Sequence, residues 1–286
     1  MAALSTRTSR IARLGVVMAG LLVALAACGG GGTPGGAGMA TQSPPPDVPG
    51  PWHLVFNDHF TGSSLDTGNW ATCYDWNDNG CTNGTNNEIE WYRPSQVSVG
   101  NGWLQLSAQR QATTGSDGHT YPWTSGMVTT GRDSWDATPR HTFTYGYFSA
   151  AIEIPAESGM FPAFWLLPAQ HYARQEIDIA EFIGSTQQVQ MTLHWQQPNG
   201  TPQFQRDSWG PVDFPAEIHV FAVDWEPGSV TWYVDGVERF RITDPAKVPT
   251  LPMELLLNLA VGYPSAPPDN VDHAVMKVDW VSVWQH

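Results

Sequence analysis

Three carboxylic acids lie close together in one short segment of this chain, Gln175-Glu176-Ile177-Asp178-Ile179-Ala180-Glu181. They alternate with apolar and β-branched residues, which is the pattern of a β-strand with one buried face. In such a strand Glu176 and Asp178 point to the same side, whereas strict alternation turns Glu181 away. A one-residue β-bulge between Asp178 and Glu181 would restore the parity, so we predict a bulged strand with all three acids on one face.

Acids gathered in this way suit catalysis better than structure, because like charges oppose each other's ionisation. With the bulge, the Cα atoms of Glu176 and Glu181 lie roughly 13 Å apart, and their side chains can close this to about 5–6 Å. That separation fits cleavage of a glycosidic bond by double displacement, in which one carboxylate attacks and the other protonates the leaving oxygen. The alternative is an exposed acidic strand on a solvated sheet face.

The elements that must position these acids are short strands. Beyond residue 52 the chain alternates apolar or aromatic runs with turns rich in Gly, Asn, Asp and Pro. Asp235-Gly236, between two such runs, is a strong hairpin signal. No stretch of about a dozen residues keeps a helical apolar period, so we predict an all-β sandwich or barrel. The runs assigned to strands are 52–60, 97–99, 104–108, 146–154, 189–195, 219–225, 230–234, 254–259 and 275–284.

The first part of the chain has the composition of an export signal and a tether. Three arginines precede an apolar run over 14–27, which is too short for a spanning helix. The run ends in Leu25-Ala26-Ala27-Cys28, which resembles a bacterial lipobox, so Cys28 would carry lipid and begin the mature chain. Cleavage after Ala26, giving a secreted protein, is the alternative. The predicted domains are a signal peptide (1–28), a flexible Gly/Pro-rich linker (29–51) and one folded domain (52–286).

The charge balance limits the partners of the chain. There are 13 Lys and Arg against 27 Asp and Glu, a formal net charge of −14. A nucleic-acid binder needs clustered basic residues and is excluded. Repulsion also disfavours sulfated or carboxylated polymers, so we expect a neutral substrate. The 14 Trp, 11 Phe and 8 Tyr suit stacking on sugar rings, but they suit a large aromatic core equally well.

In an oxidising compartment, such as an export signal leads to, cysteines that bracket a short loop are expected to pair. If Cys28 is lipidated, Cys73 and Cys81 remain, and they bracket a turn-rich segment. We therefore predict a disulfide between them. A metal site is not predicted, because no second Cys/His pair lies at ligand spacing.

The Glu-x-Asp-x-x-Glu pattern of Glu176, Asp178 and Glu181 resembles the signature of glycoside hydrolase family 16, in the bulged form of its laminarinase-like branch. Other segments resemble the family in the same order along the domain: 87–92, 145–148, 159–167, 221–225, 232–236, 258–262 and 278–283. The resemblance implies a concanavalin A-like jelly roll with a concave substrate cleft. It also implies that Glu176 is the nucleophile, that Glu181 is the general acid/base, and that Asp178 hydrogen-bonds the nucleophile.

Further residues are implied to bind substrate. Trp165 would be a stacking platform beside the cleaved bond, unless it only fills the core. His194 would lie on the leaving-group side, close to Glu181, unless it is structural. Three polar residues would hydrogen-bond sugar hydroxyls or else cap turns: Asn87, Glu88 and Asn258. Three more tryptophans could stack on sugars: Trp91, Trp123 and Trp195.

Two departures from the family pattern stand out. Ser149-Ala150-Ala151 replaces a frequent Glu-Ala-Arg, which removes an arginine that pairs with an acid or contacts sugar. Near the start, His59 stands where relatives have a glutamate. Some relatives bind a structural calcium through acids at the chain ends, and imidazole is a poor ligand for that cation. We therefore expect no required cofactor, and a calcium site involving Asp279 stays an open alternative.

The resulting expectation is a monomeric, retaining endo-β-glucanase that acts on β-1,3- or mixed β-1,3/1,4-glucan. It would be a lipoprotein of the cell surface or periplasm, in contact with the membrane only through its lipid, or else a secreted enzyme. An agarase-like galactan hydrolase and a transglycosylase are alternatives with the same chemistry. An inactive carbohydrate-binding module is an alternative of another class, although inactive relatives lack one or both of the glutamates present here.

Overall fold

Runs that alternate apolar with polar residues form the strands of this protein, because each strand buries one face in a shared core. The computed structural model describes residue 44 and residues 50–75 and 81–286, which lie within the unit Ala40–His286. The predicted signal peptide, Cys28 and most of the predicted linker lie outside the described residues. Within the described ranges, no helix is both long and apolar enough to cross a membrane.

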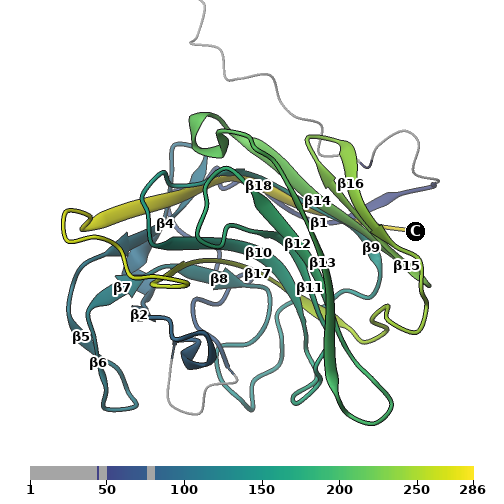
Figure 1. Ribbon diagram of the computed structural model, residues 1–286, viewed down its shortest axis with the longest axis horizontal. Helices are drawn as coiled ribbons and strands as arrows, with labels where there is room; N and C mark the ends of the chain where they lie inside the picture. Colours follow the sequence, from purple (N-terminus) through teal and green to yellow (C-terminus); the bar gives the residue numbers. More distant parts are fainter. Residues whose placement is uncertain (1–43, 45–49, 76–80) are drawn as a thin grey trace, which may run out of the picture. The chain divides into compact units, whose positions relative to one another are not determined.

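Two large sheets carry the fold (Figure 1). The ten-stranded sheet follows the order β16 (Val237–Ile242), β15 (Ser229–Val234), β14 (His219–Glu226), β9 (Gly146–Glu153), β18 (His273–Gln285), β4 (Trp103–Gln109), β7 (Trp123–Ser125) and β2 (Glu90–Tyr92), with β1 (His53–Asp58) on β18 and β3 (Val97–Gly100) on β4. The six-stranded sheet follows the order β13 (Pro202–Trp209), β12 (Val189–Gln196), β11 (Glu176–Glu181), β10 (Met160–Pro168), β17 (Met253–Val261) and β8 (Met127–Thr129). Among the described residues, the remaining elements are the ribbon β5 (Thr113–Thr114) and β6 (Thr120–Tyr121), and the 3-10 helices η1 (Gly84–Asn86), η2 (Pro94–Gln96) and η3 (Phe214–Ala216).

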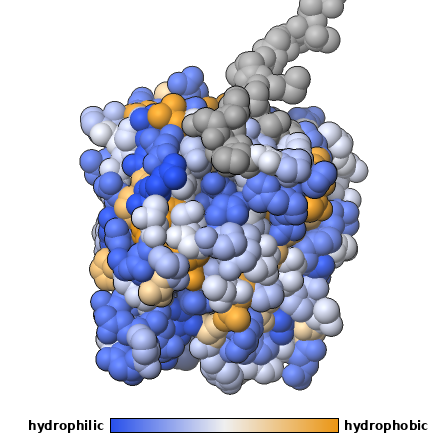
Figure 2. Space-filling model, turned by 90° about the vertical axis from the view of Figure 1, so that its right-hand side faces the viewer, coloured by the Kyte–Doolittle hydropathy of each residue, from blue (hydrophilic) through white to orange (hydrophobic). Residues whose placement is uncertain are grey.

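Side chains from both sheets fill one continuous core. Phe164 and Leu257 come from the six-stranded sheet, and Phe148 and Trp225 from the ten-stranded sheet, and all four are fully buried. Face-to-face packing of two sheets through their apolar faces defines a β-sandwich. The predicted all-β jelly roll is confirmed. The face of the molecule drawn in Figure 2 is accordingly mostly hydrophilic, with small apolar areas between polar ones.

The six-stranded sheet also has apolar residues on the face that points away from this core. Along β10, Phe164 and Leu166 enter the core, whereas Ala163 and Trp165 point to the opposite side. A second apolar cluster on that side consists of Tyr74, Tyr92, Met127, Phe161, Ala163, Trp165, Leu256 and Ala260. This cluster, called the outer cluster below, lies under the candidate site.

Two local predictions agree with the structure. Asp235 and Gly236 have φ values of 53° and 74° and join β15 to β16, as the two positive values of a type I′ hairpin require. Cys73 and Cys81 form a disulfide with a Cα–Cα distance of 5.0 Å. The backbone oxygen of Cys81 accepts a hydrogen bond from the Tyr92 N–H at 2.7 Å, so the disulfide lies next to the outer cluster.

The residues near the start of the domain are engaged in local contacts. The Asp58 carboxylate accepts hydrogen bonds from the Phe60 N–H and the Trp70 Nε1–H, both at 2.8 Å. Burial raises the pKa of Asp279, and the nearby His59 opposes that rise. In the part of the chain that the structure describes, the only group of three or more potential metal ligands lies elsewhere, on β11 and β12.

Candidate active site

The acidic strand β11 contains the predicted bulge. Its register with β12 pairs Asp178 with Thr192 and Glu181 with Gln190, so three steps along β11 match two steps along β12. The register with β10 shifts at the same place. Ile179 is 1% exposed and packs in the sandwich core. The extra residue therefore turns Glu181 to the side of Glu176 and Asp178.

A hydrogen bond from the other sheet holds this bulge. The indole Nε1–H of Trp232, on β15, donates to the backbone oxygen of Asp178 at 2.8 Å. Trp232 is fully buried, so the bond crosses the core of the sandwich. A bulge leaves backbone groups without a partner in the ladder, and a buried carbonyl without a donor is costly. Trp232 supplies that donor.

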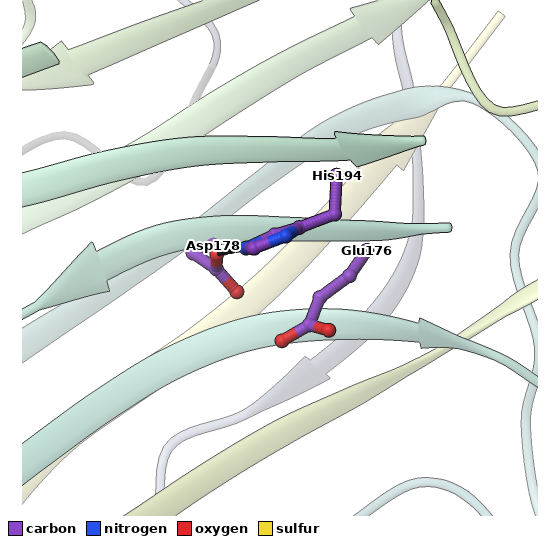
Figure 3. Close-up of side chains that lie close together, drawn as sticks. All are labelled: Glu176, Asp178 and His194. Atoms are coloured by element: carbon purple, nitrogen blue, oxygen red, sulfur yellow. Dashed lines mark hydrogen bonds and ion pairs between the residues drawn. The ribbon is translucent and has the colours of Figure 1, made fainter. Parts of the chain in front are cut away.

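Figure 3 shows Glu176, Asp178 and His194 close together on the outer face of the six-stranded sheet. His194 lies opposite Glu176 in the β11–β12 register. Its Nε2 is 3.0 Å from Oδ2 of Asp178, and one ligand atom from each of the three residues falls within 4.8 Å of the others. His194 was expected beside Glu181, and the structure places it instead beside Asp178 and Glu176, because its partner across the ladder is Glu176.

Two cavities meet at Glu176 and Trp165, which line both. The smaller one, of about 30 Å³, also includes Glu181, Glu88 and Asn258. The larger one, of about 750 Å³, crosses the strands of the six-stranded sheet near the Glu176 end of β11. Glu176 and Glu181 are half-buried and share the small cavity, whereas the Asp178 side chain is buried beneath them.

Burial and mutual repulsion shape the ionisation of these acids. Burial and the charge of Glu176 raise the pKa of Glu181 to about 8. Burial and then Asp178 raise the pKa of Glu176, and His194 works against that rise. Burial and then Glu181 raise the pKa of Asp178. The cluster therefore keeps protons at neutral pH, and Glu181, which carries one up to about pH 8, can act as a general acid.

His194 has an environment of its own. Burial lowers its pKa, which favours the neutral ring, and the charge of Glu176 opposes that effect. A neutral imidazole with its proton on Nε2 donates to the Asp178 carboxylate. His194 then fixes the orientation of Asp178 and leaves Glu176 free to react.

Trp165 is held by a chain of side-chain hydrogen bonds. Its Nε1–H donates to Oδ1 of Asn258 at 2.8 Å, and Nδ2 of Asn258 donates to the Tyr92 hydroxyl at 3.0 Å. Trp165 is 7% exposed and packs in the outer cluster, and it lines both cavities. The side chain of Asn258 lines the small cavity and orients the indole.

The two residues of the predicted Asn-Glu segment lie in different places, one at the small cavity and the other in a turn. Glu88 lines the small cavity, and its contact with sugar hydroxyls stays a prediction. Asn87 is exposed and lines neither cavity; it ends η1 with φ 57°, and its N–H bonds to the Gly84 oxygen. The left-handed conformation favours asparagine at this position and explains the residue. Asn83 and Asn86, which the sequence did not single out, line the small cavity instead.

The far wall of the large cavity is aromatic and was not predicted. Trp135 and His171 stack with ring centroids 3.6 Å apart and planes inclined by 10°. Tyr172, 88% exposed, meets Trp135 edge-on at 5.4 Å. These residues belong to two loops that are distant in sequence, so no local pattern joins them. Planar rings at the edge of a polar cavity can stack on sugar rings.

Ion pairs support this wall. His171 Nε2 lies 3.1 Å from Oδ2 of Asp75, and Arg132 Nε lies 3.2 Å from the same oxygen. Arg132 also donates to the Ala169 backbone oxygen at 2.7 Å, and this bond holds the loop after β10 against Arg132. Burial, and then Asp75, raise the pKa of Glu254 to about 8, and Arg132 opposes that rise.

Other residues named from the sequence lie outside the cavities. Trp91 packs on Tyr121, and Trp123 is fully buried beneath Arg110. Neither tryptophan lines the two cavities described above, whereas Trp195 lines the large one. Ser149, at the departure from the family pattern, is buried and bonds to Ser282 at 2.8 Å. That position therefore lies inside the ten-stranded sheet, away from the described cavities.

Comparison with known proteins agrees with this geometry. The model of the family "Glycosyl hydrolases family 16" matches residues 84–282. The β-glucanase of Rhodothermus marinus is 31% identical over 82% of this chain and 85% of its own length. The endo-1,3-1,4-β-glycanase ExsH of Rhizobium meliloti is 29% identical over 80% of this chain, which spans about half (51%) of that relative. The endo-β-1,3-glucanase structure from Pyrococcus furiosus superposes with a TM-score of 0.67 at 27% identity, over 82% of this chain and 94% of that one. The chain therefore belongs to glycosyl hydrolases family 16.

Proposed function

We propose that this protein is a retaining endo-β-glucanase that hydrolyses β-1,3- or mixed β-1,3/1,4-glucan. The observation that carries the proposal is the bulged strand β11, which turns Glu176 and Glu181 toward one small cavity. Two carboxyls that share a cavity, one holding a proton up to about pH 8, suit double displacement.

The reaction follows from the positions of these groups. Glu176 attacks the anomeric carbon while Glu181 gives its proton to the glycosidic oxygen, so the bond to the leaving sugar breaks and a glycosyl ester forms. The ionised Glu181 then takes a proton from water, and the resulting hydroxide displaces Glu176 from the same carbon. Two inversions retain the configuration and return both glutamates to their starting states. His194 holds Asp178, and Asp178 lies in hydrogen-bonding contact with Glu176 and orients it.

The choice of substrate has two supports. Two of the relatives are a β-glucanase and an endo-1,3-1,4-β-glycanase, and a similar solved structure is an endo-β-1,3-glucanase. The net charge of −14 disfavours anionic polymers and is compatible with a neutral glucan. Internal cleavage is favoured because the large cavity continues on both sides of Glu176, toward Gln203 on one side and Glu254 on the other.

The test is hydrolysis of a panel of polysaccharides by the purified full chain. We expect reducing sugar from laminarin, lichenan or barley β-glucan, none from agarose or xyloglucan, and early products of mixed length. Proton NMR during hydrolysis is expected to show the β-anomer first. Early release of the α-anomer, or cleavage of agarose alone, would overturn the proposal. Products longer than the starting oligosaccharide would indicate a transglycosylase.

We propose further that the reaction needs no cofactor. Glu176, Asp178 and His194 are residue types that could also hold a cation, but the first step above requires Glu176 as a free nucleophile. Dialysis against a chelator is expected to leave the rate of glucan hydrolysis unchanged. A loss of activity that calcium or zinc restores would contradict this.

We also propose that the protein is a lipid-anchored, exported monomer. The Leu25-Ala26-Ala27-Cys28 sequence, the apolar run before it and the Gly/Pro-rich segment after it support the proposal. Cys28→Ser is expected to release the protein from the membrane fraction into the medium or periplasm. An unchanged membrane fraction would contradict the anchor, and light scattering of the released form tests the monomer.

A further inference from the structure

Glu90 is a fully buried carboxyl to which the proposed reaction gives no role. It lies on β2, and its exposed fraction is 0%. Its Oε2 accepts a hydrogen bond from the Val261 N–H, on β17, at 2.9 Å. Its Oε1 is buried, with no hydrogen-bond partner among the described residues. A buried carboxylate oxygen without a donor costs free energy, so this atom needs an explanation.

Glu88 also has a buried carboxylate oxygen that lacks a hydrogen-bond donor in the described part of the chain. Oε1 of Glu88 accepts a hydrogen bond from Asn86 at 3.1 Å, whereas Oε2 is buried and has no partner among the described residues. Glu88 lines the small cavity together with Glu176 and Glu181. One proton shared between Glu90 and Glu88 would satisfy both orphan oxygens.

The surroundings decide which of the two acids holds that proton. Burial raises the pKa of Glu90 well above its ordinary range, and the negative Glu88 raises it further. Burial also raises the pKa of Glu88, but its polar neighbours Glu90, Asn86 and Tyr92 lower it. The described titratable groups that face Glu90 are Glu88 and three tyrosines, Tyr74, Tyr92 and Tyr121, and none of them carries a positive charge.

We propose that Glu90 is a neutral carboxyl that donates a hydrogen bond from Oε1 to Oε2 of Glu88, and thereby holds Glu88 ionised as an acceptor for a sugar hydroxyl at the wall of the small cavity. Glu90 is then a positioning residue that acts through Glu88. The function of Glu88 as a sugar acceptor rests on the proposed glucanase activity, whereas the protonation of Glu90 does not.

Thermal unfolding as a function of pH tests the proton. A group that keeps its proton in the folded state but loses it in the unfolded state destabilises the protein as pH rises. Glu90→Gln keeps a donor toward Glu88 and an acceptor for Val261, but it does not titrate. We expect the Tm of Glu90→Gln to rise relative to the original protein by roughly 3 °C for each pH unit between about pH 5 and 8.

The control is Glu217→Gln, which neutralises an exposed carboxyl. Its Tm difference from the original protein is expected to stay within about 1 °C at every pH. If the Tm difference of Glu90→Gln is equally flat, Glu90 is not a retained proton donor and the proposal fails. This measurement needs no substrate, so it stands even if the glucanase assignment is wrong.

Kinetics test the role of Glu88. Glu90→Leu removes the donor, and we expect the KM for the glucan that is cleaved to rise at least about fivefold with kcat within about threefold of the original. Glu90→Gln is expected to restore both values. An unchanged KM in folded Glu90→Leu would overturn the positioning role. If the original protein cleaved no glucan, the proposed function would fail instead.

Discussion

At the scale of single residues, the proposed acid and nucleophile differ in what surrounds them. Burial and the charges of Glu176 and Glu88 raise the pKa of Glu181, and Arg206 opposes that rise. Glu176 lies opposite His194, and His194 lowers the pKa of Glu176 when its ring is protonated. Such a difference between two neighbouring carboxyls separates the proton donor from the nucleophile.

The first prediction concerns the pH dependence of the rate. Because Glu181 must hold its proton and loses it near pH 8, we expect kcat/KM to fall as pH rises through about 8. The acid limb is expected above pH 4.5, because the pKa of Glu176 is raised from that value. Glu181→Gln is expected to lower kcat by about 10²–10⁴-fold and to remove the alkaline limb. An alkaline limb that persists in this variant would assign it to another group.

The second prediction concerns the nucleophile. Glu176→Ala removes the attacking oxygen, so we expect the rate to fall by roughly 10⁴-fold or more. Added azide can enter the space left by the carboxylate and attack the anomeric carbon directly. An activated β-glucoside is then expected to yield a glycosyl azide of inverted configuration, identified by NMR. Rescue that gives the retained configuration would contradict the assignment of Glu176 as the nucleophile.

At the scale of the elements, the site depends on the bulge in β11 and on the bond from Trp232 that holds it. Trp232→Phe leaves the Asp178 carbonyl buried without its donor, at a cost of about 1–3 kcal/mol in the free energy of unfolding. Because the bulge orients Glu181 relative to Glu176, kcat is expected to fall about tenfold while KM stays near its original value. Urea unfolding and initial rates measure the two effects.

Trp225→Phe is the matched control for that prediction. Trp225 is equally buried, and its Nε1–H donates to the Pro249 oxygen at 2.9 Å, away from β11. We expect a similar loss of stability with kcat unchanged. Equal losses of kcat in both variants would mean that the bond from Trp232 serves stability only.

A fourth prediction belongs to the loop between β10 and β11. Tyr172 has φ 66°, so Tyr172→Asn removes the ring but keeps a residue that tolerates the left-handed conformation. Loss of the ring is expected to raise the KM for long glucans several-fold and to leave that for the shortest cleaved oligosaccharide unchanged. Leu54→Ala, a substitution of an exposed apolar residue on β1, is the control. An equal rise for all chain lengths would contradict a distant stacking role.

At the scale of the whole molecule, the sequence predicted what local patterns determine. Apolar runs and alternation predicted most strands of the ten-stranded sheet and half of those in the six-stranded sheet (β11, β12 and β17). The break in alternation at Glu181 predicted the bulge. The Cys73–Cys81 disulfide closes a short loop, so it could be predicted too. The edge strand β13 was not predicted, because its mostly exposed face leaves little apolar alternation. The wall of Trp135 and His171 depends on contacts between distant loops, and no spacing in the sequence records them.

The last prediction concerns the stability of the whole fold as pH changes. Glu181 and Glu254 have pKa values raised to about 8, and Asp224 to about 7, chiefly by burial. These groups hold protons in the folded state that the unfolded chain releases, so their stability contribution is present at low pH and is lost as pH rises to about 8. We expect the Tm to be highest near pH 5 and to fall steadily up to pH 8.

Repulsion within a chain of net charge −14 also grows as acids ionise, and salt separates the two effects. Salt screens repulsion between exposed charges but acts little on buried groups. If proton retention dominates, 0.5 M sodium chloride is expected to restore only a small part of the decrease in Tm between pH 5 and pH 8. Complete recovery in salt would assign the loss to surface repulsion and would contradict proton retention by these acids, whose burial opposes ionisation.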